Sequence, residues 1–387
     1  MYFIGIDISK FKHDCAVIDQ YGTILVSSMS FGNDAEGFSL FREMLDSLNG
    51  EKRIGFESTG HYGHNLKLFL EDCGFSFMEI NAVLIKKFVR SKSLRRTKTD
   101  SIDSVAIACY LMTVDYKPCP PSFYHLDMLK SLTRFRESLI HQRSKYLVAL
   151  TNILDEAFPE FKPFFKGKFG KTALFVLRNY GSPSKIANMN SRSFSSLRKI
   201  SRGQFRMDDF VRLRELAKNS VGHPHDYLLR EMQIILTLHS QIDEQIQDVE
   251  KKIIGSIRAI DPPILSFPGI GPISAATILS EYGDMSRFSS PYKMLSYAGL
   301  EPSCFQSGTF NGSGHMVKHG SSHLRYVLMA CAGQVIHYDP TFASFYARKR
   351  KEGKHHTVAL THVVKKMIRI IYKLQTQNVL YDPSLVR

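Results

Sequence analysis

The sequence has 387 residues, of which 43% are hydrophobic, and its formal net charge is +15. This length favours two or three domains with real cores. No stretch approaches the roughly 20 apolar residues that cross a bilayer, and the N-terminus lacks a signal-peptide pattern, so we expect a cytoplasmic protein without a membrane partner. Six scattered cysteines without zinc-ligand spacing predict reduced thiols. The positive charge favours a polyanionic partner, most simply nucleic acid.

The N-terminal segment predicts a β-meander. Its three β-rich strands are Tyr2–Ile8, Asp14–Asp19 and Thr23–Ser28. Asp7 lies near the end of the first strand. A carboxylate there is often only a turn former, so Asp7 is not diagnostic by itself.

Helices and strands alternate after the meander. We predict a helix capped by Asn33 that ends near Leu48, a strand at Arg53–Glu57, a helix at His61–Glu71 and a strand at Phe75–Ile80. This order matches a ribonuclease-H-like layout, in which acids at the ends of the first and fourth strands come together. Glu57 ends the fourth strand.

A basic run precedes a helix that opens with Asp100 and Asp103. Between Lys86 and Lys98 there are seven basic residues and no acidic one, and three of them are candidate nucleic-acid contacts: Arg95, Arg96 and Lys98. Residues three apart lie on one helical face, where the two carboxylates can cap the helix or hold a divalent cation. Capping is the commoner role for such a pair. With acids on two strand ends, the set predicts a two-metal site for Mg²⁺, or Mn²⁺ in its place.

Three motifs resemble a known family. Residues 5–10 (GIDISK), 57–60 (ESTG) and 98–103 (KTDSID) resemble motifs of the DEDD transposases of bacterial insertion sequences. That group includes Piv-like invertases and bridge-RNA-guided recombinases. The resemblance covers nearly the whole chain. It implies that the acidic quartet of a RuvC-like domain consists of Asp7, Glu57, Asp100 and Asp103.

The middle of the chain is predicted to be helical. Asp127 to about Phe158 reads as one long helix, and residues 228–253 keep the four-three spacing of a coiled-coil seam, with His239 at one seam position. A helix packed inside one chain is the alternative. We favour self-association into a dimer or tetramer, because recombination needs at least two active sites together. The basic segment Phe161–Arg206 predicts short helices and receives no functional assignment.

The segment 267–275 (FPGIGPISA) resembles a helix-hairpin-helix. Gly269 and Gly271 would permit a tight turn, and backbone N–H groups at the start of the following helix would bind phosphate without reading sequence. An ordinary helix–loop–helix is the alternative.

The segment 301–308 contains the second set of chemical candidates. A serine before a glycine is usually a turn residue. The family resemblance places Ser307 at the position of the nucleophile, with Ser303 as its nearest competitor. A hydroxyl is a weak nucleophile until a base or metal activates it, and no His–Asp partner is evident nearby, so we expect the acidic quartet to supply the activation. The family usually has Gly-Asn where this chain has Gly320-Ser321.

Four more basic residues are candidate nucleic-acid contacts: Lys318, Arg325, Arg348 and Arg350. The last two belong to a basic run at 347–354, which is either a solvated helix end or a phosphate contact. A helix from about Thr357 to Gln375 follows.

The sequence therefore predicts an α/β RuvC-like (ribonuclease-H-like) domain at 1–125, a helical coiled-coil self-association region at 126–257, and a mostly α transposase domain at 258–387. The expected function is Mg²⁺-dependent DNA cleavage and rejoining through a phosphoserine, and the resemblance implies a structured guide RNA. One alternative is a RuvC-like Holliday-junction or RNase-H-like nuclease that uses water. Another is a non-catalytic nucleic-acid-binding protein.

Overall fold

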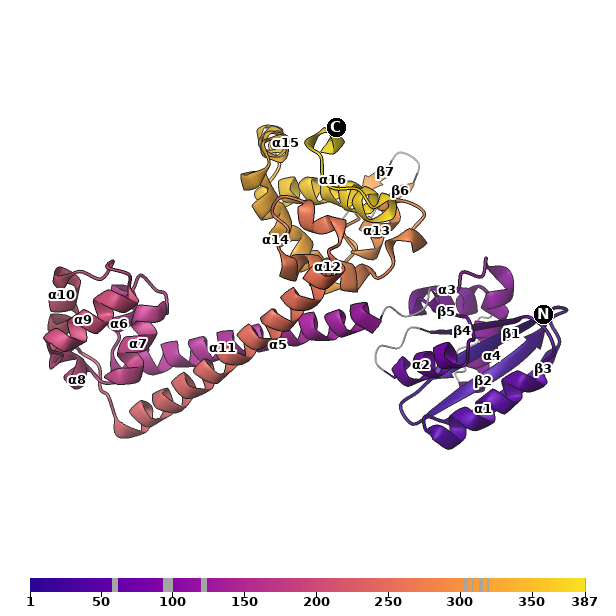
Figure 1. Ribbon diagram of the computed structural model, residues 1–387, viewed down its shortest axis with the longest axis horizontal. Helices are drawn as coiled ribbons and strands as arrows, with labels where there is room; N and C mark the ends of the chain where they lie inside the picture. Colours follow the sequence, from indigo (N-terminus) through magenta and orange to yellow (C-terminus); the bar gives the residue numbers. More distant parts are fainter. Residues whose placement is uncertain are drawn as a thin grey trace. The chain divides into compact units, whose positions relative to one another are not determined.

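The computed structural model describes residues 1–57, 62–92, 100–119, 124–301, 305–307, 310–312, 316–318 and 320–386. The chain divides into two compact units, 1–123 and 124–387 (Figure 1). The boundary lies near the predicted end of the first domain, and the predicted middle and C-terminal regions lie in one unit. No helix in the described part of the chain is long and apolar enough to span a membrane.

The first unit contains a mixed five-stranded sheet in the order β3-β2-β1-β4-β5. Its strands are β1 (Tyr2–Ile8), β2 (Lys12–Asp19), β3 (Ile24–Gly32), β4 (Lys52–Glu57) and β5 (Phe77–Ile80). The β1–β2 and β2–β3 pairs are antiparallel, as the predicted meander requires, and the β1–β4 and β4–β5 pairs are parallel. This arrangement is compatible with a ribonuclease-H-like domain.

Helices cover both faces of this sheet. Apolar side chains of α1 (Ala35–Ser47) and α2 (His64–Asp72) pack with the even-numbered residues of β1, such as Ile4 and Ile6. On the other face, α3 (Ala82–Lys92) and α4 (Asp100–Thr113) pack with Phe3. The alternation of side chains along β1 thus gives each face its own core.

The starts of β2, α2 and β5 differ from the predicted ones by two or three residues, and three further details differ as well. Strand β3 continues to Gly32 because Phe31 is buried and stacks on Phe41, with ring centroids 4.3 Å apart. Asp34, not Asn33, caps α1, since its carboxylate accepts a hydrogen bond from the amide of Gly37 at 2.8 Å. Helix α3 occupies part of the basic run, where we predicted no helix.

The second unit is built on two long antiparallel helices, α5 (Tyr124–Ala157) and α11 (Asp226–Ile260). Leu129 near the start of α5 shares a cluster with Ile253 near the end of α11, whereas Leu154 shares another with Leu228. Ion pairs join the two helices at Arg136–Glu250 and Arg143–Asp243, at 2.7 and 2.9 Å. We call this pair of helices the stalk.

The predicted coiled-coil seam is buried inside the chain. His239 is 3% exposed, and Ile246 and Ile253 are 5% and 0% exposed. Helix α5 of the same chain covers this face of α11. Self-association through the seam therefore stays a prediction, and any second copy has to use other surfaces while this packing persists.

Five short helices share a second core with the end of the stalk where α5 finishes and α11 begins (Figure 1). They are α6 (Phe161–Phe164), α7 (Lys171–Asn179), α8 (Pro183–Ala187), α9 (Ser191–Ile200) and α10 (Met207–Lys218). We call residues 159–218 the helical cap. Its short helices agree with the sequence prediction.

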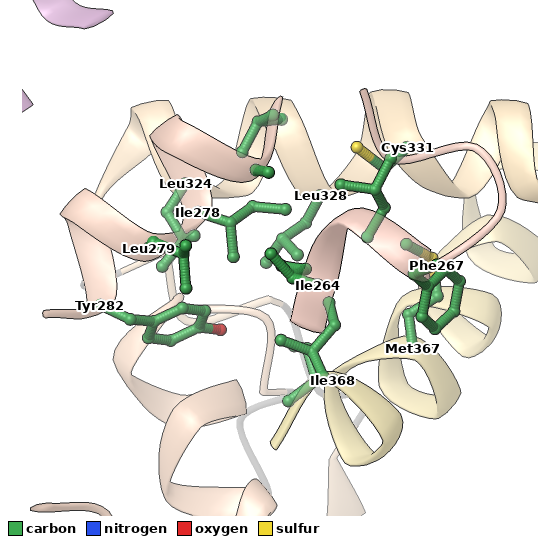
Figure 2. Close-up of a cluster of buried hydrophobic side chains, with 14 of the residues drawn as sticks. Ile264, Phe267, Ile278, Leu279, Tyr282, Leu324, Leu328, Cys331, Met367 and Ile368 are labelled. Carbon is green, nitrogen blue, oxygen red and sulfur yellow. The ribbon is translucent and has the colours of Figure 1, made fainter. Parts of the chain in front are cut away.

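The C-terminal part of this unit is mostly helical. Its helices are α12 (Pro272–Tyr282), α13 (Pro291–Tyr297), α14 (Ser322–Tyr338), α15 (Pro340–Lys351) and α16 (His356–Gln377), with 3-10 turns at Pro263–Ser266, Met285–Arg287 and Pro383–Val386. Figure 2 shows Ile278 of α12, Leu328 of α14 and Ile368 of α16 in one apolar core. A hairpin of β6 (Phe305–Ser307) and β7 (Phe310–Gly312) lies in this part of the sequence.

An ion pair with a buried carboxylate connects the stalk to this C-terminal core. Glu281 of α12 is 2% exposed, and its carboxylate accepts hydrogen bonds from Nε and Nη2 of Arg134 at 2.7 and 3.1 Å. Burial alone would raise the pKa of Glu281. The hydrogen bonds from Arg134 and Ser321, together with the charge of Arg134, outweigh burial, so the pKa is lowered.

We expect Arg134→Met to lower the free energy of unfolding by about 2–3 kcal/mol, because it leaves a buried carboxylate unpaired. Urea unfolding at neutral pH measures this loss. Arg136→Met is the matched control; its partly exposed pair with Glu250 should contribute about 1 kcal/mol or less.

The loss should also depend on pH. Because the folded-state pKa of Glu281 is lowered, its stabilisation is complete above the unfolded-state value of about 4.3 and is lost as pH falls through the folded-state pKa. The difference between Arg134→Met and the parent should therefore shrink in acid. A loss of equal size in both arginine variants would contradict the expected effect of burying the Glu281 carboxylate.

Candidate active site

Asp7 and Glu57 lie side by side at one edge of the sheet. Strands β1 and β4 are parallel neighbours, and Ile6 pairs with Phe56 in their ladder. The next residues along the two strands are the two carboxylates, both half-buried. The sequence predicted that acids at the ends of these strands come together, and the register of β1 and β4 makes Asp7 and Glu57 neighbours.

Glycines two residues before each carboxylate allow α4 to approach the sheet. A Cβ atom on Gly5 would lie 2.2 Å from the backbone oxygen of Ser104 and 2.4 Å from the backbone nitrogen of Ala108. A Cβ atom on Gly55 would lie 2.8 Å from a side chain of the same helix. Residues two apart in a strand share a face. Both carboxylates therefore lie on the face that α4 covers.

The direction of α4 places its acidic first turn at the same edge. A Cβ atom on Gly22 would lie 4.0 Å from Met112 near the end of the helix, and Gly22 follows Asp19, the partner of Tyr2 at the start of β1. Ser104, closer to the N-terminus of the helix, lies over Gly5. Helix α4 therefore runs against the direction of β1, and its first turn, with Asp100 and Asp103, points toward the end of β1 that carries the first acid.

Part of the candidate site lies outside the described residues. The Asp100 side chain lies outside the described residues, as do the basic candidates Arg95, Arg96 and Lys98. Among the described side chains, no three His, Cys, Asp or Glu residues form a group that could hold a metal ion. The fold brings the ends of β1 and β4 and the start of α4 to the same edge of the sheet. That these three elements supply the ligands of a metal stays a prediction.

Asp14 is a further carboxylate at this position that the sequence analysis missed. It pairs directly with Asp7 across the β1–β2 ladder, and it is 4% exposed. Directly opposed residues of antiparallel strands share a face. Lys12 Nζ lies 3.2 Å from the Asp14 carboxylate, which also accepts a hydrogen bond from the Ser30 hydroxyl. The turn between the first two strands fixes this register, so counting back from the turn would have found it.

Ser307 is the last residue of β6, and its backbone pairs with Phe310 of β7. Its side chain and Ser303 lie outside the described residues. Backbone hydrogen bonds hold the two ends of the segment that contains them together. The amide of Val317 donates to the carbonyl oxygen of Glu301 at 3.0 Å, and the amide of Lys318 donates to the carbonyl oxygen of Gly299 at 3.1 Å. We call these paired ends the base of the serine loop.

Close backbone contact and Arg325 tighten this base. A Cβ atom on Gly320 would lie 1.9 Å from the backbone oxygen of Tyr297, so only glycine fits there. The Arg325 guanidinium donates to the carbonyls of Gly320 and Ala298 at 2.7 and 3.2 Å. Arg325 therefore has a structural role in addition to its predicted nucleic-acid contact. Lys318 is exposed and has a φ of 52°.

The predicted hairpin motif leads from α11 through a 3-10 turn into α12. Gly269 has a φ of 82°, and a Cβ atom there would lie 2.9 Å from the backbone nitrogen of Val335. This glycine is thus required for packing against α14. Gly271 is exposed and precedes α12. Phosphate binding by this turn stays a prediction.

The basic run at the end of α15 has mixed roles. Arg348 is exposed, and its guanidinium lies 5.2 Å from the ring centre of Phe345. Arg350 donates to the carbonyl of Lys354 at 2.7 Å and so binds the chain just after its own helix. Arg348 is therefore the freer of the two to reach a phosphate.

Comparison with known proteins gives matches at both ends of the chain. The profile of the DEDD transposases of the IS110 type matches residues 4–159, and that of the IS116/IS110/IS902 transposase family matches residues 261–347. The pilin gene-inverting protein of Moraxella lacunata is 30% identical, over 99% of this chain and 98% of its own.

Two proteins of insertion elements also match over almost their full length. The 44.8 kDa protein of IS116 from Streptomyces clavuligerus is 24% identical over 99% of this chain and 96% of its own. The 42 kDa protein of IS900 from Mycobacterium paratuberculosis is 26% identical over 98% and 97%. Together with the two profiles, these matches show that the chain belongs to the IS116/IS110/IS902 family of transposases, enzymes that cleave and rejoin DNA.

Proposed function

We propose that this transposase is a site-specific recombinase that works through a transient phosphoserine bond at Ser307. The observation that carries the proposal is the register of β1 and β4, which sets Asp7 beside Glu57 on the face covered by α4. An acidic edge formed by two strands and a helix start suits phosphodiester chemistry.

The proposed ligands are Asp7, Glu57, Asp100 and Asp103. Their carboxylate oxygens fit a hard cation such as Mg²⁺ or Mn²⁺. A cation held there would stabilise charge on the scissile phosphate and favour the alkoxide form of an attacking hydroxyl. The protein's part is to fix the acids on rigid strands and one helix before DNA arrives.

In the proposed cleavage step, the Ser307 oxygen bonds to phosphorus while one P–O bond of the DNA backbone breaks. The released strand takes a proton and becomes a hydroxyl, and the phosphate stays on the serine. Attack of a DNA hydroxyl on this phosphoserine reverses the sequence, restores a phosphodiester and frees the serine. One ester replaces another at each step, so rejoining needs no external energy source.

We further propose that two or more copies act together, with a structured RNA directing target choice. Inversion of a gene, the activity named for the Moraxella relative, joins two cleaved sites and requires more than one active centre. The guide RNA rests on the resemblance of the motifs to RNA-guided members of the family.

The test is to incubate the full-length protein with the DNA ends of its own insertion element and Mg²⁺, with and without RNA transcribed from the element's flanks. We expect protein-linked DNA after denaturation, and recombinant joints only when the RNA is present. Cut DNA without linked protein would identify a nuclease that uses water. Binding without cleavage in either Mg²⁺ or Mn²⁺ would identify a non-catalytic binding protein.

A further inference from the structure

The helical cap carries most of the excess charge of the protein. Residues 159–218 contain 14 Lys and Arg against 4 Asp and Glu, a net charge of +10 out of +15 for the whole chain. Twelve of the basic side chains are exposed: Lys166, Lys168, Lys171, Arg178, Lys185, Arg192, Arg198, Lys199, Arg202, Arg206, Arg212 and Lys218. So dense a concentration of like charge repels itself and is balanced best by a polyanion.

The four acidic residues of the cap do little to neutralise its positive charge. The Glu160 carboxylate accepts hydrogen bonds from the Ser220 hydroxyl and the Val221 amide, and Asp209 accepts one from the amide of Arg206. Within the cap, all of which the structure describes, the one ion pair is Lys218–Glu215, at 2.9 Å. The other exposed cations have no acidic partner inside the cap.

Some of this charge gathers at an open pocket of about 450 Å³ at the end of α9. Its lining residues are Phe194, Ser195, Arg198, Lys199, Arg202 and Gly203. Phe194 is half-buried, with its ring centre 5.4 Å from that of Phe210, so it forms an apolar floor below three cations.

The turn after α9 holds these cations together. Arg202 and Gly203 have φ values of 54° and 83°, and their amides donate to the carbonyls of Lys199 at 3.1 Å and Arg198 at 2.8 Å. The chain therefore turns back at Arg202 instead of carrying its charge away from the helix. Arg192, seven residues before Lys199, lies on the same face of α9 and extends the row.

We propose that the helical cap binds the phosphate backbone of duplex DNA through the α9 row, with the pocket formed by Arg198, Lys199 and Arg202 at its centre. Proteins that hold single strands present exposed aromatic rings on which bases stack. The exposed large apolar side chains of the cap are Met207 and Val211, neither of them aromatic. Phe194 is half-buried and packs on Phe210, so the cap does not present it as an exposed stacking platform. Such a basic surface suits contact with phosphates of a duplex, without base readout. DNA is the partner because the family acts on DNA.

This contact lies apart from the matched family segments, since residues 160–260 fall between them. The cap would add a DNA-binding surface outside the two regions proposed to carry out catalysis. The inference needs only that the protein binds DNA, and it does not depend on Ser307 or on the acidic quartet.

The test compares the full-length protein with the variant Arg198→Ala/Lys199→Ala/Arg202→Ala. Binding of a fluorescent random-sequence DNA duplex is titrated over a range of salt concentrations without divalent metal, so that catalysis plays no part. Each lost phosphate contact should reduce the slope of log affinity against log salt by about 0.9, so we expect a decrease of about 2–3 and at least about 10-fold weaker binding at low salt. Thermal unfolding checks that the fold is retained.

The matched control is Lys145→Ala/Lys252→Ala/Arg258→Ala, which removes the same charge from exposed positions on the stalk. We expect it to change the slope little. Equal losses in both variants would mean that only total charge matters and would overturn the proposal. Unchanged duplex binding in the cap variant would also overturn it, as would a loss confined to an RNA duplex.

Discussion

Ser307→Ala is expected to bind DNA and divalent metal as the parent does, yet to form no covalent adduct and no recombinant joint. The acidic quartet can help an oxygen attack phosphorus, but it cannot form the covalent phosphate ester from which the strands are rejoined. Removing the hydroxyl therefore stops the reaction before rejoining. Denaturing gels of the parent and the variant with labelled element ends measure the adduct. The variant should show at least about 1,000-fold less of it, as the loss of a nucleophile usually does.

Ser303→Ala is the paired control, because Ser303 belongs to the same segment, is also a serine and lies four positions earlier. It should retain adduct formation. Peptide mapping of the trapped complex then identifies the linked residue. A DNA remnant on Ser303, Tyr297 or any position other than Ser307 would refute the assignment.

Asp7→Asn should reduce cleavage and recombination by at least about 100-fold while leaving the fold intact. The substitution keeps the size of the side chain but removes one negative ligand, which weakens a cation site and misplaces the phosphate. We expect the same of Glu57→Gln, Asp100→Asn and Asp103→Asn. Strand cleavage and thermal unfolding should be measured on the same preparations.

Asp46→Asn provides the matched control for this group. Asp46 belongs to α1, its side chain is 60% exposed, and it lies on the other face of the sheet, so its loss should leave cleavage unchanged. Full activity of Asp7→Asn would remove the quartet from the mechanism. A cleavage defect accompanied by a large drop in melting temperature would mean that Asp7 supports the fold instead.

The sequence predicted the sheet well because alternation, turn residues and strand-end acids are local signals. It also placed the long helix α5 and the acidic start of α4. The prediction of Asn33 as the cap of α1 was wrong, because Asn33 and Asp34 are both good caps and only the fold decides which side chain reaches the Gly37 amide.

Other features depended on contacts that no local pattern reveals. A four-three seam looks the same whether its partner is α5 of the same chain or a second copy, so the pattern alone could not decide between these two partners for Ile246. Gly269 read as a phosphate-binding turn residue, whereas close packing against Val335 also requires a glycine. The role proposed for Ser307 rests on family resemblance alone.

The joints between the stalk and the helical cap have an evolutionary consequence. The amide of His223 donates to the carbonyl of Glu156 at 2.9 Å, and a Cβ atom on Gly222 would lie 2.5 Å from the carbonyl oxygen of Ala157. The chain therefore leaves and re-enters the stalk at a single point, as it does around an inserted domain. A short turn could bridge the two helices in place of the cap, provided that apolar side chains such as Leu154 and Leu228 became polar. A single attachment point of this kind lets a segment be replaced during evolution without interrupting either long helix.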